Sequence, residues 1–341
     1  MNTHIKDSNK GHWVNRSPLS MRPYLQLSRL DRPVGYWLLA LPGWIGLAFA
    51  TLSHGFASSD LKWAVLILIG AIAMRGAGCT YNDIVDQDLD RQVERSALRP
   101  LPAGTITTKQ AWIWLFAQCG VGLVVLLCLP RLAQIISLCS IPLVAAYPFM
   151  KRITWWPQVW LGMTFNWAVL VAYAAKTGTV NPPLFILYIG LIFWTVGYDT
   201  IYACQDIEDD MKIGVKSTAR RFGKRVKLGV TLSYSIFITC IIFAVRKTAY
   251  LSKPPQPSSP DEIIGIAYVP MPFWAAFAVA ALPAIHFIQQ SISFTPQNSE
   301  ASLKLFKANT ITAVLVVISI LTLSWLVHYG VDNLNNPFTN P

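Results

Sequence analysis

Nine apolar segments, separated by short polar connections, constrain the fold of this chain more than any other feature. They lie near 34–52, 61–82, 109–129, 132–149, 157–175, 183–203, 226–245, 271–291 and 306–328. A helix needs ~20 apolar residues to cross a bilayer, and a spanning segment must satisfy its backbone hydrogen bonds internally. The sequence therefore predicts an all-α integral membrane protein with nine transmembrane helices. Pro42, Pro142 and Pro283 lie inside these segments and are expected to kink them.

Composition agrees with this class of protein. The chain is 53% hydrophobic and only 13% charged, which is typical of a protein that resides in the lipid bilayer. A net charge of +11 would suggest a nucleic-acid partner for a soluble protein. Here the basic residues lie in the connections between apolar segments, so we expect no nucleic-acid partner, and no motif indicates an obligate protein partner.

The basic residues predict the orientation in the membrane. Of the 28 Lys and Arg, 21 lie on the side of the membrane that holds the N-terminus and six on the other side. Because positively charged connections stay cytosolic, the N-terminus is predicted to be cytosolic. We expect a tail with an interfacial helix over 1–33, a membrane domain over 34–328 and a non-cytosolic tail over 329–341. The Pro-rich connection 246–270 is expected to be a loop without chemistry.

The N-terminal region predicts the compartment. The first 33 residues contain Asp7 and few Arg, whereas mitochondrial transit peptides are rich in Arg and poor in acidic residues. We therefore expect the endoplasmic reticulum or a related endomembrane rather than the mitochondrial inner membrane.

Acidic residues gather at the ends of two apolar segments. Ten of the 17 Asp and Glu lie in the windows 83–94 and 199–210, both on the predicted cytosolic side. Neighbouring carboxylates on one helix face repel each other by roughly 3 kcal/mol at ~6 Å and an effective dielectric constant of ~20. Such clusters need cations, and oxygen ligands at a hydrated site favour Mg²⁺. The candidate metal ligands are Asp83, Asp86, Asp90, Asp206 and Asp210.

Polar residues near these windows predict a substrate site. Arginine beside clustered carboxylates and Mg²⁺ suits a diphosphate, because its guanidinium binds phosphate oxygens bidentately. Arg75 precedes Asn82 by two helical turns, and Asp199 precedes Asp206 by the same distance. Arg75 and Asp199 should therefore lie deeper in the membrane than the acidic clusters and contact an acceptor. A structural ion pair with another helix is the alternative for Arg75. The candidate substrate-binding residues are Arg75, Asn82, Arg91, Tyr147, Lys151 and Asp199.

Several motifs resemble those of the UbiA superfamily of membrane aromatic prenyltransferases, over Pro23 to about Gly223. They are Asn82-Asp83-x-x-Asp86-x-x-x-Asp90, Arg95-x-x-x-Arg99-Pro-Leu, Tyr147-x-x-x-Lys151, Asp206-x-x-x-Asp210 and Lys212 to Thr218. Arg29 to Gly35 and Met74 to Cys79 resemble the 4-hydroxybenzoate polyprenyltransferase branch in particular. The resemblance implies nine helices around a central cavity and Mg²⁺ bound by the two Asp motifs. The implied catalytic residues are Asp83, Asp86, Asp206 and Asp199.

The resemblance also implies the reaction. A prenyl group, most simply farnesyl-like, would pass from its diphosphate to an aromatic carbon of a phenolic acid. The compact length resembles fungal members of meroterpenoid biosynthesis, which makes secondary metabolism the expected role. The alternative is a 4-hydroxybenzoate polyprenyltransferase of ubiquinone biosynthesis.

Two other classes fit the acidic residues less well. A cation-coupled transporter would place them near the midplane of the bilayer, and here they lie at helix ends. A phospholipid-forming phosphotransferase would carry a Gly-Ala-Arg element between its Asp residues, and the stretch Asp83 to Asp90 contains none.

Overall fold

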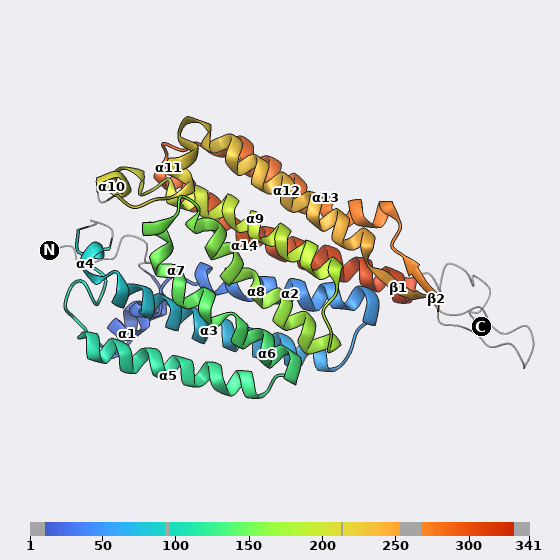
Figure 1. The fold of residues 1–341 in the computed structure, drawn as a ribbon, viewed down its shortest axis with the longest axis horizontal. Helices are drawn as coiled ribbons and strands as arrows, with labels where there is room; N and C mark the ends of the chain where they lie inside the picture. The colour runs from blue at the N-terminus through green and yellow to red at the C-terminus, as the bar shows by residue number, and fades with distance from the viewer. Residues whose placement is uncertain (1–10, 93–95, 213, 253–266, 331–341) are drawn as a thin grey trace, which may run out of the picture.

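Long helices running side by side make up most of the protein (Figure 1). The computed structural model describes residues 11–92, 96–212, 214–252 and 267–330. The long helices are α2 (Val34–His54), α3 (Ser59–Val85), α5 (Thr108–Leu127), α8 (Pro157–Thr177), α9 (Pro182–Ala203), α12 (Val226–Lys247), α13 (Phe273–Ser293) and α14 (Ser299–Trp325). The shorter ones are η1 (Trp13–Arg16), α1 (Arg22–Leu27), α4 (Gln87–Asp90), α6 (Arg131–Cys139), α7 (Ile141–Ile153), α10 (Ile207–Lys212), α11 (Thr218–Phe222), η2 (Gly223–Arg225) and η3 (Leu326–Gly330).

The all-helical membrane fold is confirmed, but the count of nine spans is not. Within the described ranges, eight helical segments are long and apolar enough to cross a membrane. The predicted fifth span, α8, has 21 residues and is not among the eight. It carries Gln158, Asn166 and Lys176, whose polar side chains lower its hydrophobicity.

Two element boundaries differ from the sequence-based expectation. The fourth predicted span is interrupted at Ser140, beside Pro142, and becomes α6 and α7; the helices continue through Pro42 and Pro283. Helix α14 begins at Ser299 and not near 306, because the side chain of Asn298 accepts a hydrogen bond from the Ala301 amide and caps the helix.

The connection 246–270 contains a hairpin where only a loop was expected. Strand β1 (Ala249–Ser252) pairs antiparallel with β2 (Ala267–Pro270), with Ala249 opposite Pro270. Tyr and Val, which favour extended backbone, occur in these strands. Residues 253–266 and 331–341, and so most of the predicted C-terminal tail, lie outside the described residues, as do 1–10.

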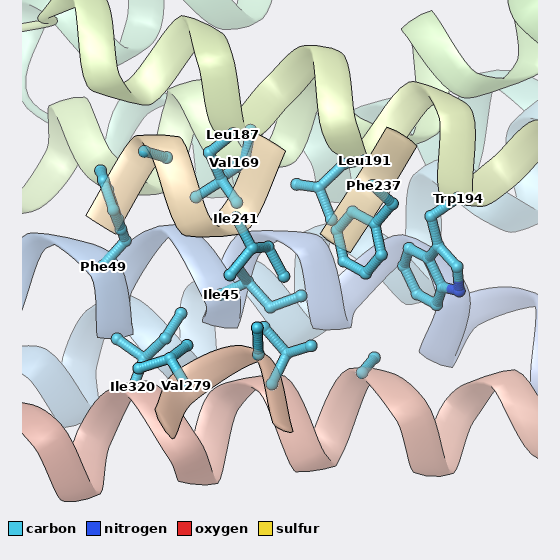
Figure 2. Close-up of a cluster of buried hydrophobic side chains, with 14 of the residues drawn as sticks. Ile45, Phe49, Val169, Leu187, Leu191, Trp194, Phe237, Ile241, Val279 and Ile320 are labelled. Atoms are coloured by element: carbon cyan, nitrogen blue, oxygen red, sulfur yellow. The ribbon is translucent and has the colours of Figure 1, made fainter. Parts of the chain in front are cut away.

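Close packing between α2, α8, α9, α12, α13 and α14 forms the main core. Figure 2 shows part of this cluster: Ile45, Phe49, Val169, Leu187, Leu191, Trp194, Phe237, Ile241, Val279 and Ile320. In a bilayer, van der Waals packing replaces the hydrophobic effect as the force that joins helices, so small residues matter. A Cβ at Gly46 would lie 2.5 Å from the backbone oxygen of Val169, so α2 and α8 need glycine there to approach.

Both acidic windows lie at one end of this bundle. Figure 1 shows α4 and α10, which follow α3 and α9, at the same end as α1 and α11, with the hairpin at the opposite end. The expectation that the two acidic stretches arrive on the same side of the membrane domain is therefore met by the helix arrangement.

Candidate active site

A polar cavity of about 220 Å³ lies at the acidic end of the bundle. Its wall comes from the ends of α3, α7, α8 and α9, from α4 and α10, and from the segments that follow α4 and precede α11. The polar and charged residues that line it are Asn82, Asp90, Ser96, Arg99, Tyr147, Lys151, Gln158, Asp199, Tyr202, Asp206, Asp210, Lys216 and Ser217. Both carboxylates and cations therefore face one small space.

Asp83, in the first acidic stretch, is fully buried and paired with a cation of the protein. Its two carboxylate oxygens accept hydrogen bonds from Nη2 of Arg29 at 2.6 and 2.9 Å, and Nη1 of Arg99 lies 3.6 Å away. Burial lowers the pKa of Arg29, but the Asp83 carboxylate, together with Cys79 and Asp31, outweighs it and raises that pKa above its usual value. Arg29 remains charged and fastens the segment after α1 to α3.

Arg29 also adopts an uncommon backbone conformation. Its φ of 57° lies in the left-handed region, which costs a non-glycine residue roughly 1–2 kcal/mol. Nearby, the Ser28 hydroxyl donates to Oε1 of Gln118 at 3.0 Å and accepts from Nε1 of Trp114 at 2.7 Å. The ion pair with Asp83 and these bonds to α5 hold the segment in place.

Asp86 and Asp90 are also neutralised by basic side chains. The Asp86 carboxylate lies 2.6 Å from Nζ of Lys151 and 2.7 Å from Nη2 of Arg152, and Asp90 lies 3.0 Å from Nη1 of Arg99. The sequence correctly indicated that these crowded carboxylates need cations. It did not reveal that the protein itself supplies several of them.

The second acidic stretch has a different setting. Asp206 and Asp210 are half-buried and form part of the cavity wall. The amide of Asp210 donates to the carbonyl of Asp206 at 2.8 Å, and the amide of Lys216 donates to the carbonyl of Lys151 at 2.9 Å. These bonds fold the segment after α10 back toward α7, so Lys216 and Lys151 line the same cavity.

Arg75 lies beneath this region, among apolar neighbours. Its guanidinium carbon is 5.1 Å from the ring centroid of Phe165, and a Cβ at Gly35 would lie 2.7 Å from its Nε. That Nε is buried and has no hydrogen-bond partner among the described residues. None of the described carboxylates forms an ion pair with Arg75, so the structural alternative considered for this residue finds no support.

The structure brings together seven of the predicted site residues and places four elsewhere. Lining the cavity are Asn82, Asp90, Tyr147, Lys151, Asp199, Asp206 and Asp210. Asp83 and Asp86 are 0% exposed and lie behind the wall, and Arg75 is not part of it. Arg91 is exposed and pairs with the exposed Asp88 at 3.3 Å.

Arg99 and Lys216 are cavity residues that the predicted site did not include. Both belong to motifs that resemble the UbiA superfamily, so the sequence did mark them. Helical spacing, however, cannot show where the side chain of a loop residue lies. Arg95, of the same motif as Arg99, lies outside the described residues.

The donor set of the cavity fits magnesium. No three carboxylate, His or Cys side chains of the described ranges are grouped as a ready-made metal site. Mg²⁺ is commonly held by only one or two carboxylates and completed by water and substrate phosphates. Asn82 with Asp90 and Asp206 with Asp210 provide two oxygen-only pairs for this purpose. Ligation by Asp83 and Asp86, predicted from the sequence, is untested; the pairing of both carboxylates with Arg29, Lys151 and Arg152 favours a structural role instead.

Together, the fold and the site define a multi-pass helical membrane protein with a cavity at one end that is lined by both carboxylates and cations. The chain belongs to the UbiA prenyltransferase family, whose model matches residues 39–313.

Curated relatives support this assignment. The chain is 47% identical over 220 residues to human mitochondrial 4-hydroxybenzoate polyprenyltransferase, covering 63% of this chain and 57% of the relative. It is 39% identical over 290 residues to the Drosophila melanogaster protein of the same name, covering 84% and 68%. It is 42% identical over 233 residues to 4-hydroxybenzoate geranyltransferase 1 of Lithospermum erythrorhizon, covering 67% and 74%. The match to the human protein thus spans little more than half of that relative.

Solved structures share the fold. The apo UbiA homologue of Aeropyrum pernix K1 has a TM-score of 0.64 at 21% identity, covering 85% of this chain and 98% of the homologue. A UbiA homologue of Archaeoglobus fulgidus bound to DMAPP and Mg²⁺ has a TM-score of 0.62 at 17% identity, covering 88% and 98%. These comparisons establish the arrangement of helices.

Proposed function

We propose that this protein is a Mg²⁺-dependent aromatic prenyltransferase that attaches a polyprenyl group to 4-hydroxybenzoate. The observation that carries the proposal is the cavity in which Asp90, Asp206 and Asp210 face Arg99, Lys151 and Lys216. Carboxylates that can hold Mg²⁺ beside cations that can hold phosphate are what ionisation of a diphosphate ester requires. The three curated relatives all carry 4-hydroxybenzoate in their names.

The residues of the cavity have different roles in the proposed reaction. Arg99, Lys151 and Lys216 bind the oxygens of the donor diphosphate, since charge-assisted hydrogen bonds to phosphate are strong. Bound Mg²⁺ would stabilise the departing diphosphate. The carbon–oxygen bond to the diphosphate breaks, and the apolar bundle beneath shields the resulting allylic cation from water. The ring carbon ortho to the phenol attacks this cation and then loses its proton, which leaves with the released diphosphate. Asp199, on the cavity wall, orients the acceptor hydroxyl.

Arg75 supplies the acceptor carboxylate site. Its Nε is a buried donor without a partner in the described protein, and a buried unpaired donor costs ~1–3 kcal/mol. A carboxylate on the aromatic ring would satisfy that donor and neutralise the charge. The position two turns below Asn82, about 10 Å along α3, separates this site from the diphosphate.

Farnesyl transfer in a meroterpenoid pathway, the role expected from the sequence, has no support among these relatives. They favour the alternative reading, a 4-hydroxybenzoate polyprenyltransferase of ubiquinone biosynthesis. The names of the human and Drosophila proteins also favour mitochondria over the endoplasmic reticulum, so we propose a mitochondrial membrane. The cytosolic orientation of the N-terminus stays a prediction from the basic residues.

Product analysis tests this proposal. Purified protein is supplied with geranyl, farnesyl and longer prenyl diphosphates and with 4-hydroxybenzoate or an orsellinic-type acid, and products are identified by mass spectrometry. We expect prenylated 4-hydroxybenzoate, its loss in EDTA and its return with Mg²⁺. Turnover that persists in EDTA, or a product from the orsellinic-type acid alone, would contradict the proposal. A fluorescent fusion compared with mitochondrial and endoplasmic reticulum markers tests the compartment.

A further inference from the structure

A second cavity lies outside the candidate active site, between α12 and α13. This groove has a volume of about 610 Å³. It is lined by Lys227, Thr231, Tyr234, Ser235, Ile238, Thr239, Ala284, Phe287, Ile288, Ser291 and Ile292. Tyr234 and Phe287 stack in it, with ring centroids 4.0 Å apart. None of these residues lines the polar cavity.

The groove is suited to an apolar chain although five residues with a hydroxyl group line it, among them three on the outer face of α12. Thr231, Ser235 and Thr239 follow one another at helical spacing, and each hydroxyl donates to the carbonyl four residues earlier in α12, at 3.0, 3.0 and 2.9 Å. Their donors are therefore already satisfied. Their small side chains leave a channel beside the bulkier Ile238 and Ile288, which belong to the same groove.

One end of the groove is basic. Lys227, at that end, is exposed and its Nζ donates to the carbonyl of Ile292 at 3.0 Å. An ammonium has three donors, so further hydrogen bonds are available to it. Arg221, Lys224 and Arg225 are exposed within six residues of it, and in the described chain none of these four basic residues has an ion-pair partner.

The length of the groove matches one leaflet. From Lys227 to Thr239 the groove extends over 12 residues, or about 18 Å at 1.5 Å per residue. The hydrocarbon core is ~30 Å thick, so one leaflet is roughly 15 Å deep. A lipid whose headgroup reaches Lys227 would place one acyl chain along the groove.

We propose that this groove is a binding site for an anionic phospholipid of the surrounding bilayer. The phosphate lies against Lys227 and the neighbouring basic residues, and one acyl chain lies between α12 and α13. Charge complementarity selects the headgroup, because basic residues near a membrane surface attract anionic lipids. The apolar walls and the one-leaflet depth select a lipid over a free anion.

Native mass spectrometry of the purified full-length protein tests the site. Phosphatidylglycerol and phosphatidylcholine with identical acyl chains are titrated separately. We expect phosphatidylglycerol to be retained preferentially, and Lys227→Gln to reduce its binding roughly fivefold, as expected for one surface charge. Lys307→Gln, which removes an exposed lysine of α14 that does not line the groove, is the matched control and should change nothing.

A second variant tests the acyl-chain part. Ser235→Leu, on an exposed position of α12, fills the groove and should reduce binding of both lipids; Thr239→Leu replaces it if thermal melting shows that Ser235→Leu does not fold. Glycerol phosphate, the headgroup without chains, should not displace the lipid. Equal binding of the two lipids, full displacement by glycerol phosphate or unchanged binding in the filled variants would overturn the proposal.

Discussion

The two acidic stretches look alike in the sequence but lie in different surroundings. Asp83 and Asp86 are completely buried and contact Arg29, Lys151 and Arg152. Asp206 and Asp210 are half-buried and line the cavity. Carboxylates three or four residues apart can therefore lie in two different settings, one buried against basic side chains and one on the wall of a cavity. The difference comes from which other segments reach each stretch.

The role of Asp83 gives the largest expected effect. Asp83→Asn leaves Arg29 buried without its counter-charge, and breaking a buried ion pair in this way costs about 3–5 kcal/mol. We expect a clear loss of thermal stability in detergent. The double variant Arg29→Asn/Asp83→Asn should recover part of it, because asparagine tolerates the left-handed backbone at position 29.

Asp88→Asn is the matched control for that comparison. The Asp88 side chain is 92% exposed, and its pairing with Arg91 at the surface is worth ~0–1 kcal/mol. The melting temperature of Asp88→Asn should equal that of the unsubstituted protein. Equal stability of Asp83→Asn and Asp88→Asn would contradict the claim that Asp83 stabilises the fold.

Asp206 gives the next largest effect, on turnover and not on stability. Losing one preorganised electrostatic contact to the leaving group reduces turnover roughly 10²–10³-fold, so we expect that loss in Asp206→Asn. Its melting curve should be unchanged because Asp206 is only half-buried, between α9 and α10. Steady-state prenylation and thermal unfolding on the same preparation separate the two effects. Unfolding with intact specific activity would show that Asp206 is structural.

Arg75 separates acceptor recognition from donor binding. A hydrogen bond to a charged group contributes ~1.5–3 kcal/mol, so Arg75→Ala should raise the KM for 4-hydroxybenzoate roughly 10- to 100-fold. The KM for the prenyl diphosphate should barely change. Arg75→Lys should rescue only in part, because an ammonium lacks the planar fork of donors. A selective rise in donor KM would assign Arg75 to the diphosphate.

The smallest effect is expected at Arg91. It pairs with Asp88 in solvent, whereas Arg99 lines the cavity and contacts Asp90 at 3.0 Å. Arg91→Gln should leave the donor KM within about twofold, as surface pairs contribute little, and Arg99→Gln should raise it by more. Donor titrations of both variants test this order. A larger defect in Arg91→Gln would restore its predicted place at the diphosphate.

The sequence predicted what depends on local spacing. Apolar length located the helices, and Asp199 and Asp206, both singled out from the sequence, line one cavity. What it could not show depends on contacts between distant segments. Arg29 meets Asp83 across 54 positions, and only the folded chain after α10 brings Lys216 beside Lys151. The early start of α14 arose from a cap at Asn298 in a polar stretch, where hydrophobic length carries no signal.

Measuring metal binding in two variants tests most directly whether Asp206 binds the metal and Asp83 only stabilises the fold. Mn²⁺, used in place of Mg²⁺, is titrated by electron paramagnetic resonance into protein with a non-reactive prenyl diphosphate analogue. We predict that Asp206→Asn loses bound Mn²⁺ while remaining folded, and that the folded fraction of Asp83→Asn retains it. Loss of Mn²⁺ in Asp83→Asn at unchanged stability would contradict the account, and would make Asp83 a metal ligand.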